Sequence, residues 1–235
     1  MAEIDPVIQC EQSEPGTACV TSALCSAIHD FGSVRVRTPY AQAGQRIGIM
    51  GGSFNPPHDG HRIVAETALK RLRLDQLWWV VTPGNPLKSK SGLPSAAHRI
   101  GAAREFARGP RMKLTAFEQE LGTPYTAATL AFLKRRHARV HFVWIMGADN
   151  LAHFDRWQHW RSIAAGFPLA IVDRPGWRFK ALSGRAAQSL QASRCREPDA
   201  ALLSRRPAPS WMFLTARLSP LSSSDLRERA ARHKT

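Results

Sequence analysis

Two histidines three residues apart, His58 and His61, stand where the chain could bind an anion. They follow Gly51 and Gly52 and an apolar run, Arg46 to Met50, that predicts a buried strand. Apolar residues at helical spacing follow them and predict a helix that begins near His58. The free N–H groups of a helix N-terminus attract negative charge, and an imidazole can donate to phosphate oxygens. A pair of glycines alone is weak evidence, but the histidines in this setting predict a phosphate-handling site.

A second cluster of this kind lies near the C-terminus. Ser222, Ser223 and Ser224 precede a helix expected from Asp225, and Arg227 would lie about one turn inside it. Hydroxyls, free N–H groups and a guanidinium suit phosphate oxygens. A serine that merely caps the helix explains the serines equally well.

Between these clusters, Gly147 and Asp149 follow a predicted strand, Val140 to Met146. A carboxylate at the end of a strand can accept hydrogen bonds from ribose hydroxyls. Asp149 is as well suited to capping a helix, and the two roles are compatible.

These residues need a scaffold of alternating strands and helices. Further strands are predicted at 76–82, 112–116, 167–172 and 211–215. Helices are predicted from Ser95 to Ala107, after Thr126 and over 149–165, whereas 177–208 is expected to be irregular with one helix. The pattern predicts an α/β fold, a Rossmann-like doubly wound parallel sheet with helices on both faces. Ligands of such sheets bind beyond the carboxyl ends of the strands, where all three motifs fall.

Composition narrows the setting of the protein. The 235 residues, 43% of them hydrophobic, suit one domain, and no apolar run has the length of a membrane span. Residues 1–44 lack periodicity and are expected to be a poorly ordered extension, with a single domain over 45–235. Four cysteines without metal-ligand spacing, and the lack of a signal peptide, predict a cytoplasmic protein.

Positive charge is concentrated in the expected domain. Residues 1–44 hold two arginines against five acidic residues, whereas 45–235 hold 31 basic against 13 acidic residues, a net charge of +18. This charge attracts polyanions. It fits a phosphate-rich small substrate, a nucleic acid or only a solvated basic surface, and charge alone does not separate the three.

The first cluster resembles the nucleotidyltransferase superfamily, which transfers a nucleoside monophosphate from a nucleoside triphosphate. Its pattern G-[TS]-F-[DN]-P-x-H-x-G-H is matched with Asn55 in place of the commoner Asp. The C-terminal cluster is similar to the superfamily's I-S-S-T-x-[IL]-R element, with Leu221 for Ile and Ser224 for Thr. The resemblance implies that His58, His61 and Arg227 are catalytic. It also implies an ATP site that comprises Gly51, Gly52, Ser53, Phe54, His58, His61, Gly147, Asp149, Leu221, Ser222, Ser223, Ser224 and Arg227.

Smaller matches between these elements narrow the resemblance. They are 124–130 (PYTAATL), Gly147-x-Asp149-x-Leu151, 157–160 and 173–176 (DRPG). In this order they resemble the bacterial nicotinate-nucleotide adenylyltransferases, over about residues 46–229. The resemblance implies ATP and nicotinate mononucleotide as substrates, and Mg²⁺ that enters with ATP and for which no protein ligand is predicted. The residues implied near the mononucleotide are Asn85, Lys88, Tyr125, Thr126, Trp157 and Arg174.

The resemblance also leaves room for departures and alternatives. The chain ends soon after the last motif and carries an unusual N-terminal lead; a homo-oligomer is possible. Enzymes that adenylylate phosphopantetheine are the nearest alternative, but typically have Thr where His58 stands. Cytidylyltransferases share His-x-Gly-His but lack the Pro-Tyr-Thr and Arg-Pro-Gly elements. Class I aminoacyl-tRNA synthetases also share it, but residues 88–91 (KSKS) come too early to be their lysine loop. A nucleic-acid-binding module would explain the charge, but no basic-aromatic motif of that class is present.

Overall fold

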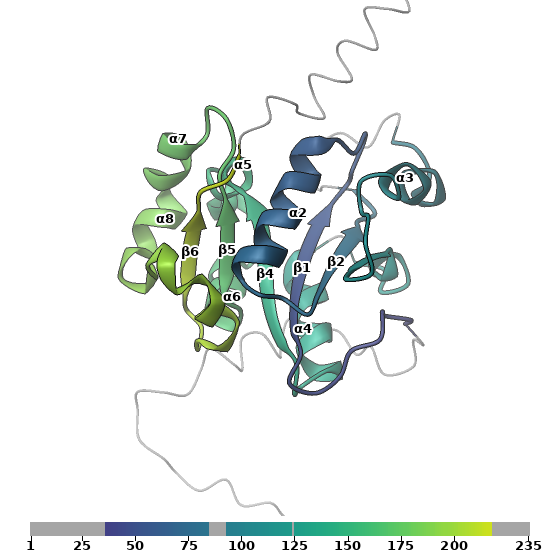
Figure 1. Ribbon diagram of the computed structural model, residues 1–235, viewed down its shortest axis with the longest axis horizontal. Coiled ribbons are helices and arrows are strands. Elements are labelled where there is room, and N and C mark those ends of the chain that lie inside the picture. The colour runs from purple at the N-terminus through teal and green to yellow at the C-terminus, as the bar shows by residue number, and fades with distance from the viewer. Residues whose placement is uncertain (1–35, 85–92, 124, 218–235) are drawn as a thin grey trace, which may run out of the picture.

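The computed structural model describes residues 36–84, 93–123 and 125–217 (Figure 1). Six strands alternate with helices along this part of the chain. The strands are β1 (Arg46–Gly52), β2 (Gln76–Val81), β3 (Met112–Thr115), β4 (His141–Gly147), β5 (Leu169–Val172) and β6 (Trp211–Leu214). The α-helices are α2 (Asp59–Arg71), α3 (Ala96–Ala103), α4 (Thr126–Arg136), α5 (Ala148–Leu151), α6 (Trp160–Gly166), α7 (Arg178–Leu182) and α8 (Arg185–Ser189). The 3₁₀ helices are η1 (Phe117–Gln119), η2 (Phe154–Arg156), η3 (Gln191–Ser193) and η4 (Glu197–Arg205).

The strands form one parallel sheet in the order β3-β2-β1-β4-β5-β6. The chain winds outward from β1 to β3 and then returns to the centre to place β4 on the other side of β1. The predicted doubly wound parallel sheet is therefore confirmed. The direction of winding reverses between β1 and β4, and open α/β sheets bind their ligands at such a switch point.

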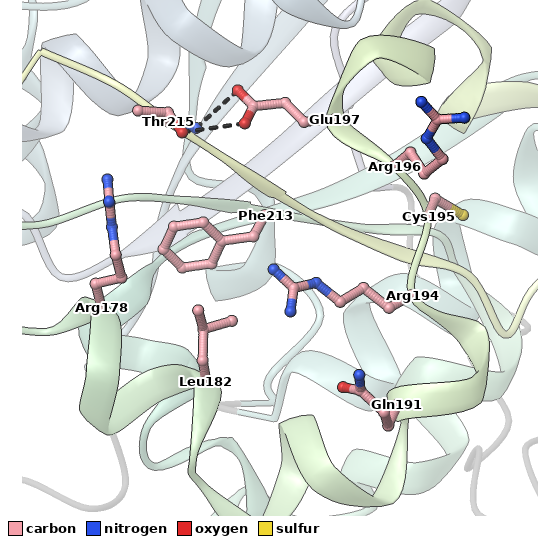
Figure 2. A pocket seen from close by; sticks show the side chains of 9 residues that line it. All are labelled: Arg178, Leu182, Gln191, Arg194, Cys195, Arg196, Glu197, Phe213 and Thr215. Carbon is pink, nitrogen blue, oxygen red and sulfur yellow. Dashed lines mark hydrogen bonds between the residues drawn. The ribbon is translucent and has the colours of Figure 1, made fainter.

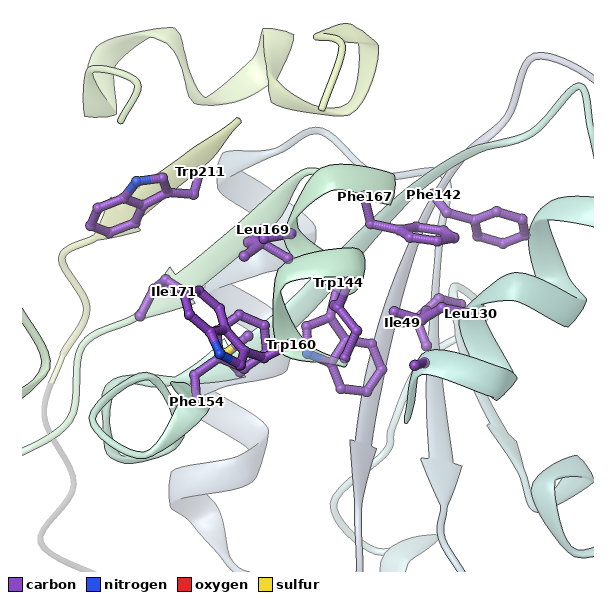
Figure 3. Packing of buried hydrophobic residues seen from close by; sticks show 14 of the residues in the cluster. Ile49, Leu130, Phe142, Trp144, Phe154, Trp160, Phe167, Leu169, Ile171 and Trp211 are labelled. Carbon is purple, nitrogen blue, oxygen red and sulfur yellow. The ribbon is translucent and has the colours of Figure 1, made fainter. Parts of the chain in front are cut away.

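Each face of the sheet is buried against its own helices, because neighbouring residues of a strand point to opposite faces. Ile49, Trp78 and Trp144 face α4, α5 and α6, in what we call the α4-side core (Figure 3). Met50 and Trp79 face α2 and α3, in the α2-side core. Burial on both faces explains why the strands are continuous apolar runs and not alternating ones.

Two helical segments differ from their predictions. The helix predicted over 149–165 is divided into α5, η2 and α6, because Trp157 is extended and His159 adopts a left-handed φ of 55°. This break lets the Phe154 ring pack against the rings of Trp157 and Trp160, with centroid distances of 5.4 Å and 5.8 Å respectively. Residues 177–208 contain α7, α8, η3 and η4 in place of the single helix predicted.

Residues 36–44 are packed against the fold. Val36 is only 2% exposed and belongs to the α4-side core. The Gly44 N–H donates to the Arg139 carbonyl over 2.7 Å, and the Thr38 hydroxyl is 3.1 Å from Nε2 of His137. The folded part of the chain therefore begins no later than Val36, earlier than the predicted boundary at residue 45.

Candidate active site

The connection from β1 to α2 makes a tight reversal at the switch point. Phe54 has a left-handed φ of 45°, the Asn55–Pro56 peptide is cis, and His58 is the extended N-cap residue of α2. The helix begins at Asp59, as predicted. The helix starts at the carboxyl edge of the sheet, and N–H groups at a helix N-terminus suit an anion.

The two histidines lie together in this turn. Their ring centroids are 3.9 Å apart, and His58 is buried to 3% exposure. His61 meets the edge of Phe54 at 5.0 Å, and Phe54 in turn stacks on Trp79 at 5.0 Å with an interplanar angle of 22°. The aromatic packing holds the His61 ring in place on one side of the turn.

Gly51 and Gly147 lie where another residue would not fit. A Cβ atom on Gly51 would lie 2.7 Å from the ring of Trp144, which is buried on β4. A Cβ atom on Gly147 would collide with Oδ1 of Asp149 and lie 3.2 Å from the Arg174 side chain. Both glycines thus allow neighbouring side chains to come close to the ends of β1 and β4.

Asp149 and Arg174 face each other beyond β4 and β5. Oδ1 of Asp149 lies 3.8 Å from Nε of Arg174, a loose ion pair. This carboxylate oxygen is buried and accepts no hydrogen bond from the described residues. A buried acceptor needs a donor, and a ligand hydroxyl would supply one.

The position of Arg174 is fixed by its neighbour Asp173, which directly follows β5. Asp173 is 4% exposed, and its Oδ1 accepts the Arg174 N–H over 2.9 Å. Its Oδ2 accepts from Nε of Arg178 at 3.0 Å and also from Nη2. Asp173 is part of the match at residues 173–176, but the family resemblance implied no role for it.

Tyr125 and Thr126 lie at the start of α4, and Tyr125 is largely exposed. Thr129, one turn into the helix, donates to the carboxylate of Glu118 over 2.7 Å. Glu118 is 2% exposed, and burial raises the pKa of its carboxyl group to about 7. No sequence signal had singled out Glu118.

Trp157 packs edge-on against Trp144, with centroids 6.2 Å apart, and against Phe154. It is half-buried, so one part of the ring belongs to the α4-side core and the rest reaches solvent. Such a ring can serve both packing and contact with a flat ligand.

Several predicted site residues lie outside the described part of the chain. They are Asn85, Lys88, Leu221, Ser222, Ser223, Ser224 and Arg227. Whether the C-terminal motif meets the histidines therefore stays a prediction.

A pocket of about 460 Å³ lies beside the edge strand β6 (Figure 2). Phe213 lies between Arg178 and Arg194 in this view, and the Arg178 guanidinium lies 6.0 Å from the centre of its ring. Glu197 closes one end and accepts hydrogen bonds from the Thr215 N–H and hydroxyl at 2.9 Å and 3.0 Å. The pocket contains none of the site residues predicted from the sequence.

The described residues contain no group of three or more His, Cys, Asp or Glu side chains that could hold a metal ion. None of their helices combines the length and apolar character needed to cross a membrane.

Comparison with known proteins adds relatives of the whole domain. The family model described as cytidylyltransferase-like matches residues 49–229. A protein of Rhizobium johnstonii is 52% identical over 189 residues, 80% of this chain and 95% of its own length. One of Rhizobium meliloti is 55% identical over 181 residues, 77% of this chain and 96% of its own. Both are named probable nicotinate-nucleotide adenylyltransferase.

Among solved structures, the fold is similar to the nicotinic acid mononucleotide adenylyltransferase of Plasmodium falciparum complexed with NaAD. The TM-score is 0.59 at 19% identity, over 78% of this chain and 83% of the other. At this identity the similarity concerns the fold alone.

Proposed function

The chain belongs to the nicotinate-nucleotide adenylyltransferases of the cytidylyltransferase-like family, and we propose that it transfers AMP from ATP to nicotinate mononucleotide. The products are nicotinate adenine dinucleotide and pyrophosphate, a step of NAD biosynthesis. The observation that carries the proposal is the pair of histidine rings 3.9 Å apart at the start of α2, at the switch point of a parallel sheet.

The reaction is a displacement at the α-phosphorus of ATP. A phosphate oxygen of the mononucleotide forms a new bond to that phosphorus while the bond to the β-phosphate bridging oxygen breaks, and pyrophosphate leaves with the electron pair. Because the nucleophile is already an anion, no general base is required. The protein contributes positioning and stabilisation of negative charge.

His58 and His61 are the donors proposed for the α-phosphate. Both belong to the turn whose helix N–H groups also face the anion position. His61 is given the larger role, because Phe54 supports its ring at 5.0 Å and a supported donor needs little reorganisation. Arg227 is proposed to offset charge on the departing pyrophosphate, as the family motif implies.

The mononucleotide is proposed to lie beyond β4 and β5. Oδ1 of Asp149, which accepts no hydrogen bond from the described residues, can accept one from a ribose hydroxyl, and Arg174 can bind a phosphate. Trp157 offers a ring face for nicotinate, and the backbone N–H groups around Tyr125 and Thr126 at the start of α4 can bind its carboxylate.

Mg²⁺ is proposed to enter as part of the ATP substrate, bound to phosphate oxygens. Such an ion keeps several water ligands and needs few from the protein.

The test is pyrophosphate release from ATP with a panel of acceptors: nicotinate mononucleotide, nicotinamide mononucleotide and phosphopantetheine. We expect rapid release with the first and the appearance of the dinucleotide. Release only with phosphopantetheine would assign the chain to the neighbouring activity. No release with any acceptor, together with salt-sensitive RNA binding, would instead favour the nucleic-acid-binding module.

A further inference from the structure

Arg99 is buried directly beside the phosphate-handling turn. It lies on α3, whose N-cap Ser95 accepts the His98 N–H over 3.2 Å, and its side chain is directed into the fold with 3% exposure. Arginine is rarely buried to this extent unless it is paired. A specific reason for its burial is therefore expected.

The guanidinium group joins three segments through their carbonyls. Its Nη1 donates to the Ser53 carbonyl at 2.8 Å and to the Thr82 carbonyl at 2.7 Å, and its Nε donates to the Pro94 carbonyl at 3.1 Å. Ser53 belongs to the β1–α2 turn and Thr82 directly follows β2. One side chain thus fixes the distance between the carboxyl ends of two neighbouring strands.

No carboxylate among the described residues forms an ion pair with Arg99. Burial lowers the pKa of its guanidinium from the ordinary value, but arginine stays protonated in proteins at neutral pH. Carbonyl dipoles alone compensate this charge, so burying it is costly. A position that served only packing would be filled at less cost by an apolar side chain.

The Ser53 carbonyl matters because of the peptide that it belongs to. The Ser53–Phe54 peptide is trans, so its carbonyl and the Phe54 N–H lie in one plane and point in opposite directions. When Arg99 holds the carbonyl, it also sets the direction of the Phe54 N–H and the seat of the Phe54 ring. That ring supports His61.

We propose that Arg99 is a positioning residue for adenylyl transfer, whose side chain presets the Phe54 peptide and the His61 ring by holding the Ser53 and Thr82 carbonyls. The proposal rests on the function proposed above. It assigns Arg99 no contact with substrate. Arg99 acts through the β1–α2 turn, so its replacement should lower kcat, the turnover rate of the enzyme with both substrates bound.

The experiment compares Arg99→Lys and Arg99→Met with the wild type, and uses Arg104→Met as the matched control. Arg104 is the C-cap residue of the same helix, and its side chain is exposed. Steady-state kinetics with ATP and nicotinate mononucleotide give kcat and both KM values. Thermal melting reports folding, and hydrogen exchange of peptides that cover residues 51–61 reports the turn.

We expect Arg99→Met to lower kcat by about 30- to 100-fold, since a misplacement of about 1 Å at a reacting centre can have that effect. Arg99→Lys keeps the charge but not the planar fork, and should lower kcat by about 3- to 10-fold. Both KM values should change by less than about threefold. Exchange should rise at 51–61 but not in β4 and β5, and Arg104→Met should match the wild type.

Three results would overturn the proposal. The first is a folded Arg99 variant with kcat within twofold of the wild type. The second is a rise of both KM values by the same factor as the fall of kcat, together with faster hydrogen exchange throughout the sheet. The third is failure of both Arg99 variants to fold. Either of these two results would make Arg99 a general scaffold residue. A wild type that is inactive with every acceptor would refute the proposed function. The exchange of 51–61 would then decide alone whether Arg99 holds the turn.

Discussion

His61 stands between a second imidazole and an aromatic ring, with centroids 3.9 Å from His58 and 5.0 Å from Phe54. These contacts restrict the ring before substrate arrives, which is the condition under which a hydrogen-bond donor stabilises a transition state most. His61→Ala should therefore lower kcat on the order of a hundredfold or more, equivalent to about 3–4 kcal/mol.

The control for His61 is His98→Ala. His98 is exposed on α3 and makes only a backbone contact with the N-cap serine, so its loss should leave kcat unchanged. Steady-state pyrophosphate release checks both variants. Near-normal turnover in His61→Ala would remove the histidine from the proposed mechanism.

Glu118 gives the fold a dependence on pH. Burial raises the pKa of its carboxyl group from 4.5 to about 7, and the hydrogen bond from Thr129 offsets only part of this rise. Because the folded state holds the proton more tightly, the stability from protonated Glu118 is complete below about pH 4.5. It is lost as the pH rises through 7.

Glu118→Gln should remove this dependence, because the amide keeps an acceptor for Thr129 and never ionises. At pH 8 the variant should be more stable than the wild type by up to roughly 3 kcal/mol, and at pH 4.5 the two should be alike. Urea unfolding at several pH values checks this. A constant difference across that range would contradict the assignment.

At the end of β1, next to the histidine turn, Gly51 leaves room for the close approach of a neighbouring side chain. Gly51→Ala would put a methyl group 2.7 Å from the ring of Trp144, which is packed in the α4-side core and cannot move freely. We expect a loss of about 1–3 kcal/mol in the free energy of unfolding, with a lower kcat.

Gly101→Ala is the matched substitution in a helix. Nothing lies within 4 Å of its added Cβ, and Gly101 lies inside α3. This change should stabilise the protein by up to about 1 kcal/mol. Thermal melting of both variants separates close approach from glycine's general flexibility. Equal effects of the two substitutions would show that Trp144 accommodates the methyl group.

Burial pattern decides which of the helices and strands could be predicted from the sequence. Strands such as β2 and β4 are buried on both faces, so they are continuous apolar runs that predict strands from the sequence alone. The break between η2 and α6 was missed because it depends on how three aromatic rings share the core. Phe154, Trp157 and Trp160 recur at a spacing that also suits one continuous helix, so the sequence gives no local signal of the break.

At the candidate site, the positions of the histidines and Asp149 at the carboxyl edge were predictable because each follows a strand in a parallel sheet; their roles stay predictions. Arg99 was not, since its partners lie 17 and 46 residues away and only the assembled sheet brings them together. Glu118 was missed for a related reason. Its significance is its burial, which a sequence does not display.

For the whole molecule, the order of the strands gathers residues from distant parts of the chain at one edge. The β1–α2 turn, Gly147 at the end of β4 and Arg174 after β5 come together because β1, β4 and β5 are neighbours in the sheet. Arg99 then connects this edge to β2. The groups proposed to bind phosphate and the group proposed to bind ribose therefore lie at one edge of the sheet, where they could act on one dinucleotide.

The folded domain includes residues that precede the first strand, because some of them are buried against it. Val36 lies in the α4-side core, and the Arg37 N–H donates to the Glu120 carboxylate over 2.9 Å. Removal of residues 2–44 should therefore lower the free energy of unfolding more than removal of 2–35. We expect a difference of about 2–4 kcal/mol, from one buried valine and several hydrogen bonds. Urea unfolding of the two shortened chains measures it, and Val36→Ala in the full chain, expected to lose about 1–2 kcal/mol, isolates the apolar part. Equal stability of the two shortened chains would mean that residues 36–44 only lie on the surface and that the domain does begin at residue 45.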